Sequence, residues 1–186
     1  MAKTYRFGDA SRPGLLLGLS ARQAIPLIGG TAKGAGNLIS GNRFNGIDLR
    51  TRATVQGNLI GTNAAGTAAI PNGDIDYDDN AAINVGSDGG FPDPSEASSG
   101  VVIGGTAPGA GNVIAGNLGE GIRLDAADYQ VLGNLIGIDA TGTVVLPNAE
   151  ADIEAGGDNA GPGQIGGVEP GEANTIAHGD GAGVQV

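Results

Sequence analysis

The feature of this sequence that most constrains its fold is an internal repeat. Residues 28–42 read Ile-Gly-Gly-Thr-Ala, a glycine-rich turn, Asn, an apolar pair and a final Gly-Asn, and residues 103–117 repeat this pattern. A third, degraded copy starts at Ile165, and a second phrase, Gly57-Asn-Leu-Ile-Gly, returns at Gly133. Recurring units of this kind are typical of solenoids, in which each unit packs only against its neighbours.

Composition narrows the class further. Glycine accounts for 37 of 186 residues but lacks the strict three-residue period of collagen, so it indicates many tight turns. The chain has no cysteine, which excludes a disulfide framework and a thiolate metal site. No run of apolar residues is long enough for a membrane span, and the start of the chain lacks the hydrophobic segment of a secretory signal. We therefore expect one repeat domain with a continuous apolar core.

Aligned by motif, the short apolar segments fall into three columns, which predicts fifteen strands in five coils of three. The first column reads Gly-Ile-x-Leu, the second has a β-branched residue before Gly, and the third reads Asn-x-Ile. Period-two spacing places Asn and Ile of the third column on the same, inward side. In the first column the residue between the inward positions is always polar, which predicts that it faces outward: Asp48, Asn84, Arg123, Glu154 and Gln185.

This pattern resembles the right-handed parallel β-helix repeats of large bacterial surface and secreted proteins, which share the pectate-lyase-like solenoid fold. The resemblance covers residues 28–186 and implies an all-β, right-handed parallel β-helix at an extracellular or cell-surface location. Residues 1–27 lie outside the repeat, and we expect a cap or an attachment segment there. In such folds corner asparagines bond along the axis, and the resemblance assigns this ladder to Asn37, Asn58, Asn112, Asn134 and Asn174.

Polysaccharide-active members of this fold carry outward carboxylates and basic residues on neighbouring strands. The corresponding candidates are Arg123 and Glu154, which lie side by side if the coils stack in order, together with Asp48. One interpretation is a lyase-like base with a charge-stabilising carboxylate, and the other is an ion pair across strands. The column holds only two acids, fewer than the calcium-binding cluster of such lyases, which favours the ion pair.

Two loops hold further candidates. Asp74, Asp76, Asp78 and Asp79 could bind Ca²⁺ through hard oxygen ligands, but the glycine and glutamate of an EF-hand loop are missing, which favours a solvated acidic loop. Tyr77 and Phe91 are the aromatic residues of the large loops and hence the candidates for binding a surface glycan. The single histidine, His178, follows the third repeat and is interpreted as a surface turn residue.

The charges are distributed unevenly along the chain. Eight of the nine Lys and Arg residues lie in residues 1–52, whereas 18 of the 20 acidic residues lie in 53–186. Because sequence position is axial position in a solenoid, this predicts a basic end and an acidic rod, which disfavours nucleic acid as a partner. The leading hypothesis is a non-catalytic structural or adhesive module that associates head to tail through its coil ends into a fibre. The alternatives are an enzyme of the pectate lyase or polygalacturonase type and a segment of a phage or secretion-apparatus fibre.

Overall fold

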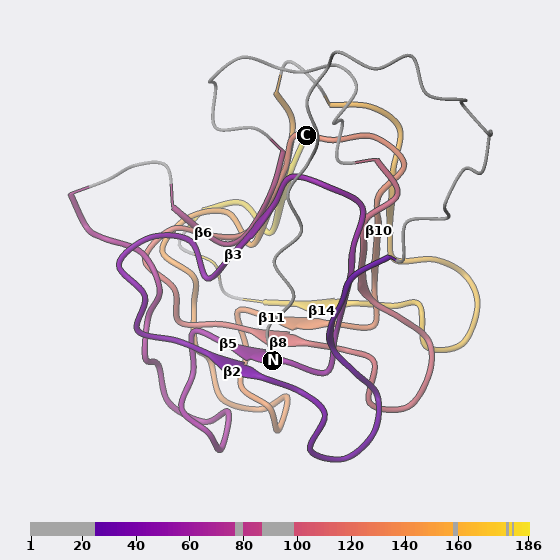
Figure 1. The fold of residues 1–186 in the computed structure, drawn as a ribbon. Helices are drawn as coiled ribbons and strands as arrows, with labels where there is room; N and C mark the ends of the chain where they lie inside the picture. Colours follow the sequence, from indigo (N-terminus) through magenta and orange to yellow (C-terminus); the bar gives the residue numbers. More distant parts are fainter. Residues whose placement is uncertain (1–24, 77–79, 87–98, 158–159, 178, 180) are drawn as a thin grey trace, which may run out of the picture.

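The chain forms a parallel β-helix with three strands per coil. The structure is a computed structural model and describes residues 25–76, 80–86, 99–157, 160–177, 179 and 181–186. These residues form fifteen short strands, and they include no helix long and apolar enough to cross a membrane. Successive strands pass from sheet A to sheet B to sheet C, and the three sheets form the sides of a triangle around which the chain winds (Figure 1). Coil 1 therefore holds β1–β3, and coil 5 holds β13–β15.

Each sheet contains one strand from every coil. Sheet A consists of β1 (Leu27–Gly29), β4 (Thr54–Gln56), β7 (Val102–Gly104), β10 (Gln130–Leu132) and β13 (Gln164–Ile165). Sheet B consists of β2 (Leu38–Ile39), β5 (Leu59–Ile60), β8 (Val113–Ile114), β11 (Leu135–Ile136) and β14 (Thr175–Ile176). Sheet C consists of β3 (Ile47–Leu49), β6 (Ala81–Val85), β9 (Glu120–Leu124), β12 (Ile153–Ala155) and β15 (Val184–Gln185).

The register confirms the three columns predicted from the sequence. In sheet C, the first inward residue of each strand pairs with its counterpart in the next coil: Ile47, Ile83, Ile122, Ile153 and Val184. The β-branched residues of sheet A and the isoleucines of sheet B align in the same way. Because strand side chains alternate between faces, this register sends one apolar stripe from each sheet to the interior. The largest fully buried side chains are Ile60, Ile83, Ile103, Ile114, Ile122, Leu124, Ile136, Ile153, Val55, Val85, Val101 and Val131.

The coils alternate between two types, as the spacing of the repeat predicts. Odd coils carry a six-residue insert at the corner between sheets A and B, called here the first corner: residues 31–36, 106–111 and 168–173. Each insert contains the same turn, in which the backbone N–H of Ala35, Ala110 or Glu172 donates to the carbonyl three residues earlier. Even coils have no insert but carry a hairpin at the second corner, between sheets B and C. Isolated antiparallel bridges, Thr62 to Ala69 in coil 2 and Ile138 to Val145 in coil 4, close these hairpins.

Each loop of this kind extends past its own coil and reaches the next loop of the same type. In the first corner, a Cβ on Gly109 of the coil-3 insert would lie 2.6 Å from the carbonyl oxygen of Thr31 in the coil-1 insert. In the second corner, the N–H of Ala140 in the coil-4 hairpin donates to the carbonyl of Gly66 in the coil-2 hairpin at 2.8 Å. Neighbouring coils are about 4.8 Å apart, so each loop fills the height of two coils, about 10 Å.

The predicted asparagine ladder lies inside the first corner and is confirmed. The Nδ2 amide of each asparagine donates to Oδ1 of the asparagine in the next coil, with distances of 2.9 Å from Asn37 to Asn58, 3.0 Å from Asn58 to Asn112, 2.9 Å from Asn112 to Asn134 and 3.0 Å from Asn134 to Asn174. The backbone N–H groups of the first four donate to the same oxygens. The three middle amides, of Asn58, Asn112 and Asn134, are almost fully buried, and these bonds satisfy them as burial of a polar group requires.

A second ladder, which the sequence analysis did not assign, lies inside the second corner. Its Nδ2-to-Oδ1 distances are 2.8 Å from Asn42 to Asn72, 2.9 Å from Asn72 to Asn117 and 2.9 Å from Asn117 to Asn148. The sequence does contain a signal for it, because each of these asparagines follows Gly or Pro at the same place in its coil. At Asn148 this ladder reaches a carboxylate of its own coil, since Asn148 Nδ2 donates to Asp152 Oδ1 at 2.9 Å.

Candidate functional site

The predicted outward column lies on sheet C, and the structure places its members side by side. Asp48 pairs with Asn84, Asn84 with Arg123, Arg123 with Glu154, and Glu154 with Gln185. Arg123 Nε lies 3.5 Å from Glu154 Oε2, so the expected proximity of these two residues is confirmed. Asp48 lies at the other end of the column, where it accepts hydrogen bonds from Asn84 and Arg50. The three candidates therefore do not form one cluster.

The structure adds Glu120, which the sequence analysis missed. Glu120 is the first residue of β9 and is only 2% exposed, and its Oε1 lies 3.6 Å from Arg123 NH2. Because it precedes the Gly-Ile-x-Leu segment, the column alignment left it outside the strand. One signal in the sequence could have indicated it. The neighbouring coils have alanine at this position, Ala81 in coil 2 and Ala151 in coil 4, whereas coil 3 has Glu120.

Burial and its neighbours keep Glu120 protonated. Burial, a side-chain hydrogen bond with Glu154 and the charge of Glu150 raise the pKa of Glu120 to about 8, against the opposing effect of Arg123. As a carboxylate, Glu120 would leave its buried Oε2 without a hydrogen-bond donor. The raised pKa favours the neutral carboxylic acid, which avoids this cost.

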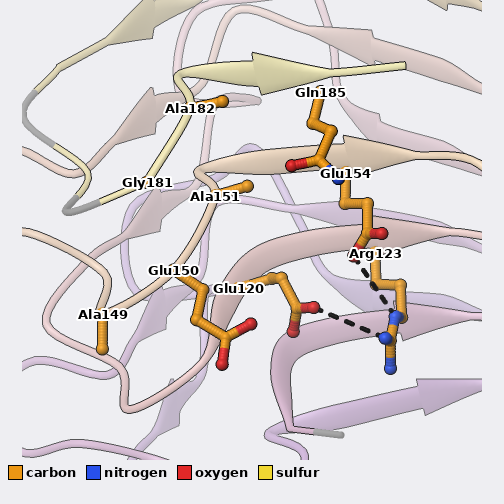
Figure 2. Close-up of a pocket in the computed structure, with 9 residues that line it drawn as sticks. All are labelled: Glu120, Arg123, Ala149, Glu150, Ala151, Glu154, Gly181, Ala182 and Gln185. Atoms are coloured by element: carbon orange, nitrogen blue, oxygen red, sulfur yellow. Dashed lines mark ion pairs between the residues drawn. The ribbon is translucent and has the colours of Figure 1, made fainter. Parts of the chain in front are cut away.

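These side chains line an open pocket on the outside of coils 3 to 5, with a volume of about 390 Å³. Figure 2 shows the Arg123 guanidinium in ion pairs with both Glu120 and Glu154, with Glu150 beside Glu120 and Gln185 beyond Glu154. The remaining lining residues are alanines and a glycine. Chemically, the pocket offers a held proton, two carboxylates and one fixed cation. Its lining includes no aromatic side chain on which a sugar ring could stack.

The other predicted site residues are only partly described. Asp74 accepts a 2.8 Å hydrogen bond from Arg43 Nε, and this bond lowers the pKa of Asp74. The N–H of Asp76 donates to Asp74 Oδ1. In the described parts of the chain, no group of three or more acidic or histidine side chains could hold a metal ion. The remaining candidates, Tyr77, Asp78, Asp79, Phe91 and His178, lie outside the described residues, so the Ca²⁺ and glycan predictions stay open there.

A second candidate surface is the coil-5 end, which comprises the edges of β13, β14 and β15 together with the insert 168–173. These three strands are the last in their sheets, so one edge of each pairs with no described strand. Apolar side chains are exposed here, with Val168 97% and Val184 43% exposed. Unpaired parallel edges with exposed apolar residues form a template for strand addition.

Comparison with protein-family models, curated proteins and solved structures gives no match for the chain. Its function must therefore be argued from the pocket and from the coil-5 end.

Proposed function

We propose that this chain is a non-catalytic structural or adhesive module of a rod, and that its coil-5 end receives the next coil. The observation that carries the proposal is the open end of the first ladder. Each earlier ladder asparagine gives its backbone N–H and an Nδ2 hydrogen to the next coil, but within the described residues no acceptor receives these hydrogens from Asn174. A polar group prepared for a bond in this way is supporting evidence for an axial neighbour.

The charges bear on the choice of neighbour. The coil-5 insert carries Glu169 and Glu172, whereas the coil-1 insert carries Lys33, and all three lie on exposed turns or beside them. Charge alone would favour a second copy of this chain, docked through its coil 1. Such surface attraction is weak, however, and is screened by salt. The shapes of the loops constrain the choice of neighbour more strongly than these charges.

An extension experiment tests the proposal. A repeat coil is joined after Val186 through a flexible Gly/Ser linker, and hydrogen exchange is measured at the Asn174 amide. If the coil-5 end accepts a neighbour, a tethered repeat coil slows this exchange, whereas a scrambled sequence of the same composition leaves it unchanged. Exchange that is equally fast with every tether would contradict the proposal.

The pocket favours a second candidate function, the cleavage of a glycan. The supporting observation is the proton held by Glu120 next to the Glu154 carboxylate, since acid–base pairs with separated pKa values perform such chemistry. Against a lyase-type role, Arg123 is engaged by two acidic side chains, Glu120 and Glu154, and is not open to a substrate as a base. Turnover of acidic and neutral polysaccharides that is lost in Glu120→Gln but kept in Glu150→Gln would support this function.

A further inference from the structure

The neighbour that fits the coil-5 end can be identified from the alternation of the coils, and this inference rests on the proposed function. The first ladder does not distinguish an odd neighbour from an even one, because coils of both types supply an asparagine at this position. The loops do distinguish the two types of coil, because each loop fills the height of two coils. An additional coil must therefore leave room for the loop that coil 5 already carries.

In the first corner, the insert leans back over the coil before it. The N–H of Gly133, in coil 4, donates to the carbonyl of Glu172 in the coil-5 insert at 3.3 Å, and a Cβ on Gly171 would lie 3.0 Å from Thr106 O in coil 3. The coil-3 insert covers Gly57 in the same way. An odd coil placed on coil 5 would bring its own insert back into the height that residues 168–173 occupy. An even coil, which has no insert, would leave that height free.

In the second corner, the hairpins indicate the same neighbour. Gly66 at the tip of the coil-2 hairpin is covered by Ala140, and a Cβ there would lie 2.5 Å from the Ala140 side chain. Gly142 is the equivalent residue of the coil-4 hairpin, and a Cβ on it would meet no atom within 4 Å. A hairpin carried by a sixth coil of the even type would lie over Gly142 as Ala140 lies over Gly66.

We propose that the coil that packs on the coil-5 end is of the even type. It carries a β-branched or apolar strand, one residue and Gly at the first corner, then Asn-x-Ile, followed by a hairpin. Its asparagine accepts from the Asn174 N–H and Nδ2, and its hairpin covers Gly142. Coil 1 of a second copy does not fit this description, because coil 1 is odd and its insert would meet the coil-5 insert.

The test compares two tethers on the full chain. The even tether has the sequence of residues 129–148, and the odd tether has the sequence of residues 101–117. We expect the even tether to slow hydrogen exchange at the Asn174 amide by about tenfold or more and the odd tether to leave it unchanged. Equal protection by both tethers would overturn the even-coil inference and leave the proposed function in place. Protection by neither would overturn both.

A matched variant and a free peptide sharpen this test. In the chain with the even tether, Gly142→Ala should remove part of the protection, because its Cβ stands where the docked hairpin lies. A labelled peptide with the sequence of residues 129–148, added to the unextended chain, should bind measurably more tightly than the same peptide with leucine in place of its ladder asparagine. The loss of two hydrogen bonds to Asn174 corresponds to about a tenfold weaker affinity. Equal affinities of the two peptides would overturn the inference.

Discussion

The two asparagine corners of this solenoid are built alike but end differently. Both bury a ladder of side-chain amides, and both carry loops that reach across an intervening coil. Among the described residues, Asn174 of the first ladder has no acceptor in a further coil, whereas in the second ladder Asn148 donates to the Asp152 carboxylate of coil 4. The difference indicates that a buried ladder can be closed by a residue of its own coil.

The loops of the two corners explain why the coils alternate. Inserts of odd coils meet one another over the even coils, and the hairpins of the even coils meet over coil 3. Each corner therefore has room for one loop in every two coils. Alternation is the arrangement that lets both corners be filled without a gap or a clash.

The largest loss of stability is expected for a substitution at the first corner, where the packed inserts leave no space for an added side chain. Gly57 has a φ of 68°, and a Cβ there would lie 2.3 Å from Gly30 O and 2.9 Å from Gly109 O. Gly57→Ala should destabilise the fold by about 3 kcal/mol or more, because steric overlap adds to backbone strain. Gly142→Ala in the second corner is the matched control, since its φ is 69° but its surroundings are open, and it should cost about 1 kcal/mol. Equal losses in denaturant unfolding would contradict the proposed loop packing.

The second-largest loss of stability is expected when a central asparagine of either ladder is replaced. Asn112→Leu in the first corner and Asn117→Leu in the second each leave buried donors and acceptors without partners, so each should cost about 2–4 kcal/mol. Asn174→Leu should cost about 1 kcal/mol, because Asn174 has a ladder neighbour on one side. Urea unfolding of the three variants measures this order, and a cost for Asn174→Leu that equals the cost for Asn112→Leu would break the comparison.

The start of β9, directly after the second corner, should give the fold a pH dependence. The pKa of Glu120 rises from 4.5 to about 8 on folding, so the folded state binds more protons between these values. Stability should therefore fall as pH rises from about 4.5 to 8, by an amount on the order of 2–4 kcal/mol. Glu120→Gln should flatten this part of the pH profile in thermal unfolding and stabilise the chain at pH 8, whereas Glu150→Gln should reduce the slope only slightly, because Glu150 makes the smallest contribution to the pKa of Glu120. A parallel decline in the variant and the unchanged chain would assign the effect to other groups.

The smallest effect is expected for the unextended chain in solution. Because coils 1 and 5 are both odd, copies should not stack head to tail in spite of their opposite charges. Light scattering should give a mass of 18.1 kDa at every concentration, at low and at high salt. A mass that grows with concentration and falls with salt would instead support the head-to-tail fibre expected from charge.

The candidate site was only partly predictable from the sequence. The proximity of Arg123 and Glu154 followed from the strand register, which motif spacing fixes. Glu120 was not predictable in the same way, because its burial depends on how the chain closes at the second corner. Its pKa is raised first by this burial and then by Glu154 and Glu150, which belong to coil 4.

By itself the sequence determined the strands, their register, the alternation of coils and the first ladder. These features follow from local spacing, since a period of two sends the same positions inward in every coil. Only the tertiary structure decided the second ladder's closure by Asp152, the double height of the loops and the open pocket beside Glu120. Those features depend on which atoms of one coil meet the next, and a repeat pattern gives the order of the coils along the axis but not how far a loop extends past its own coil.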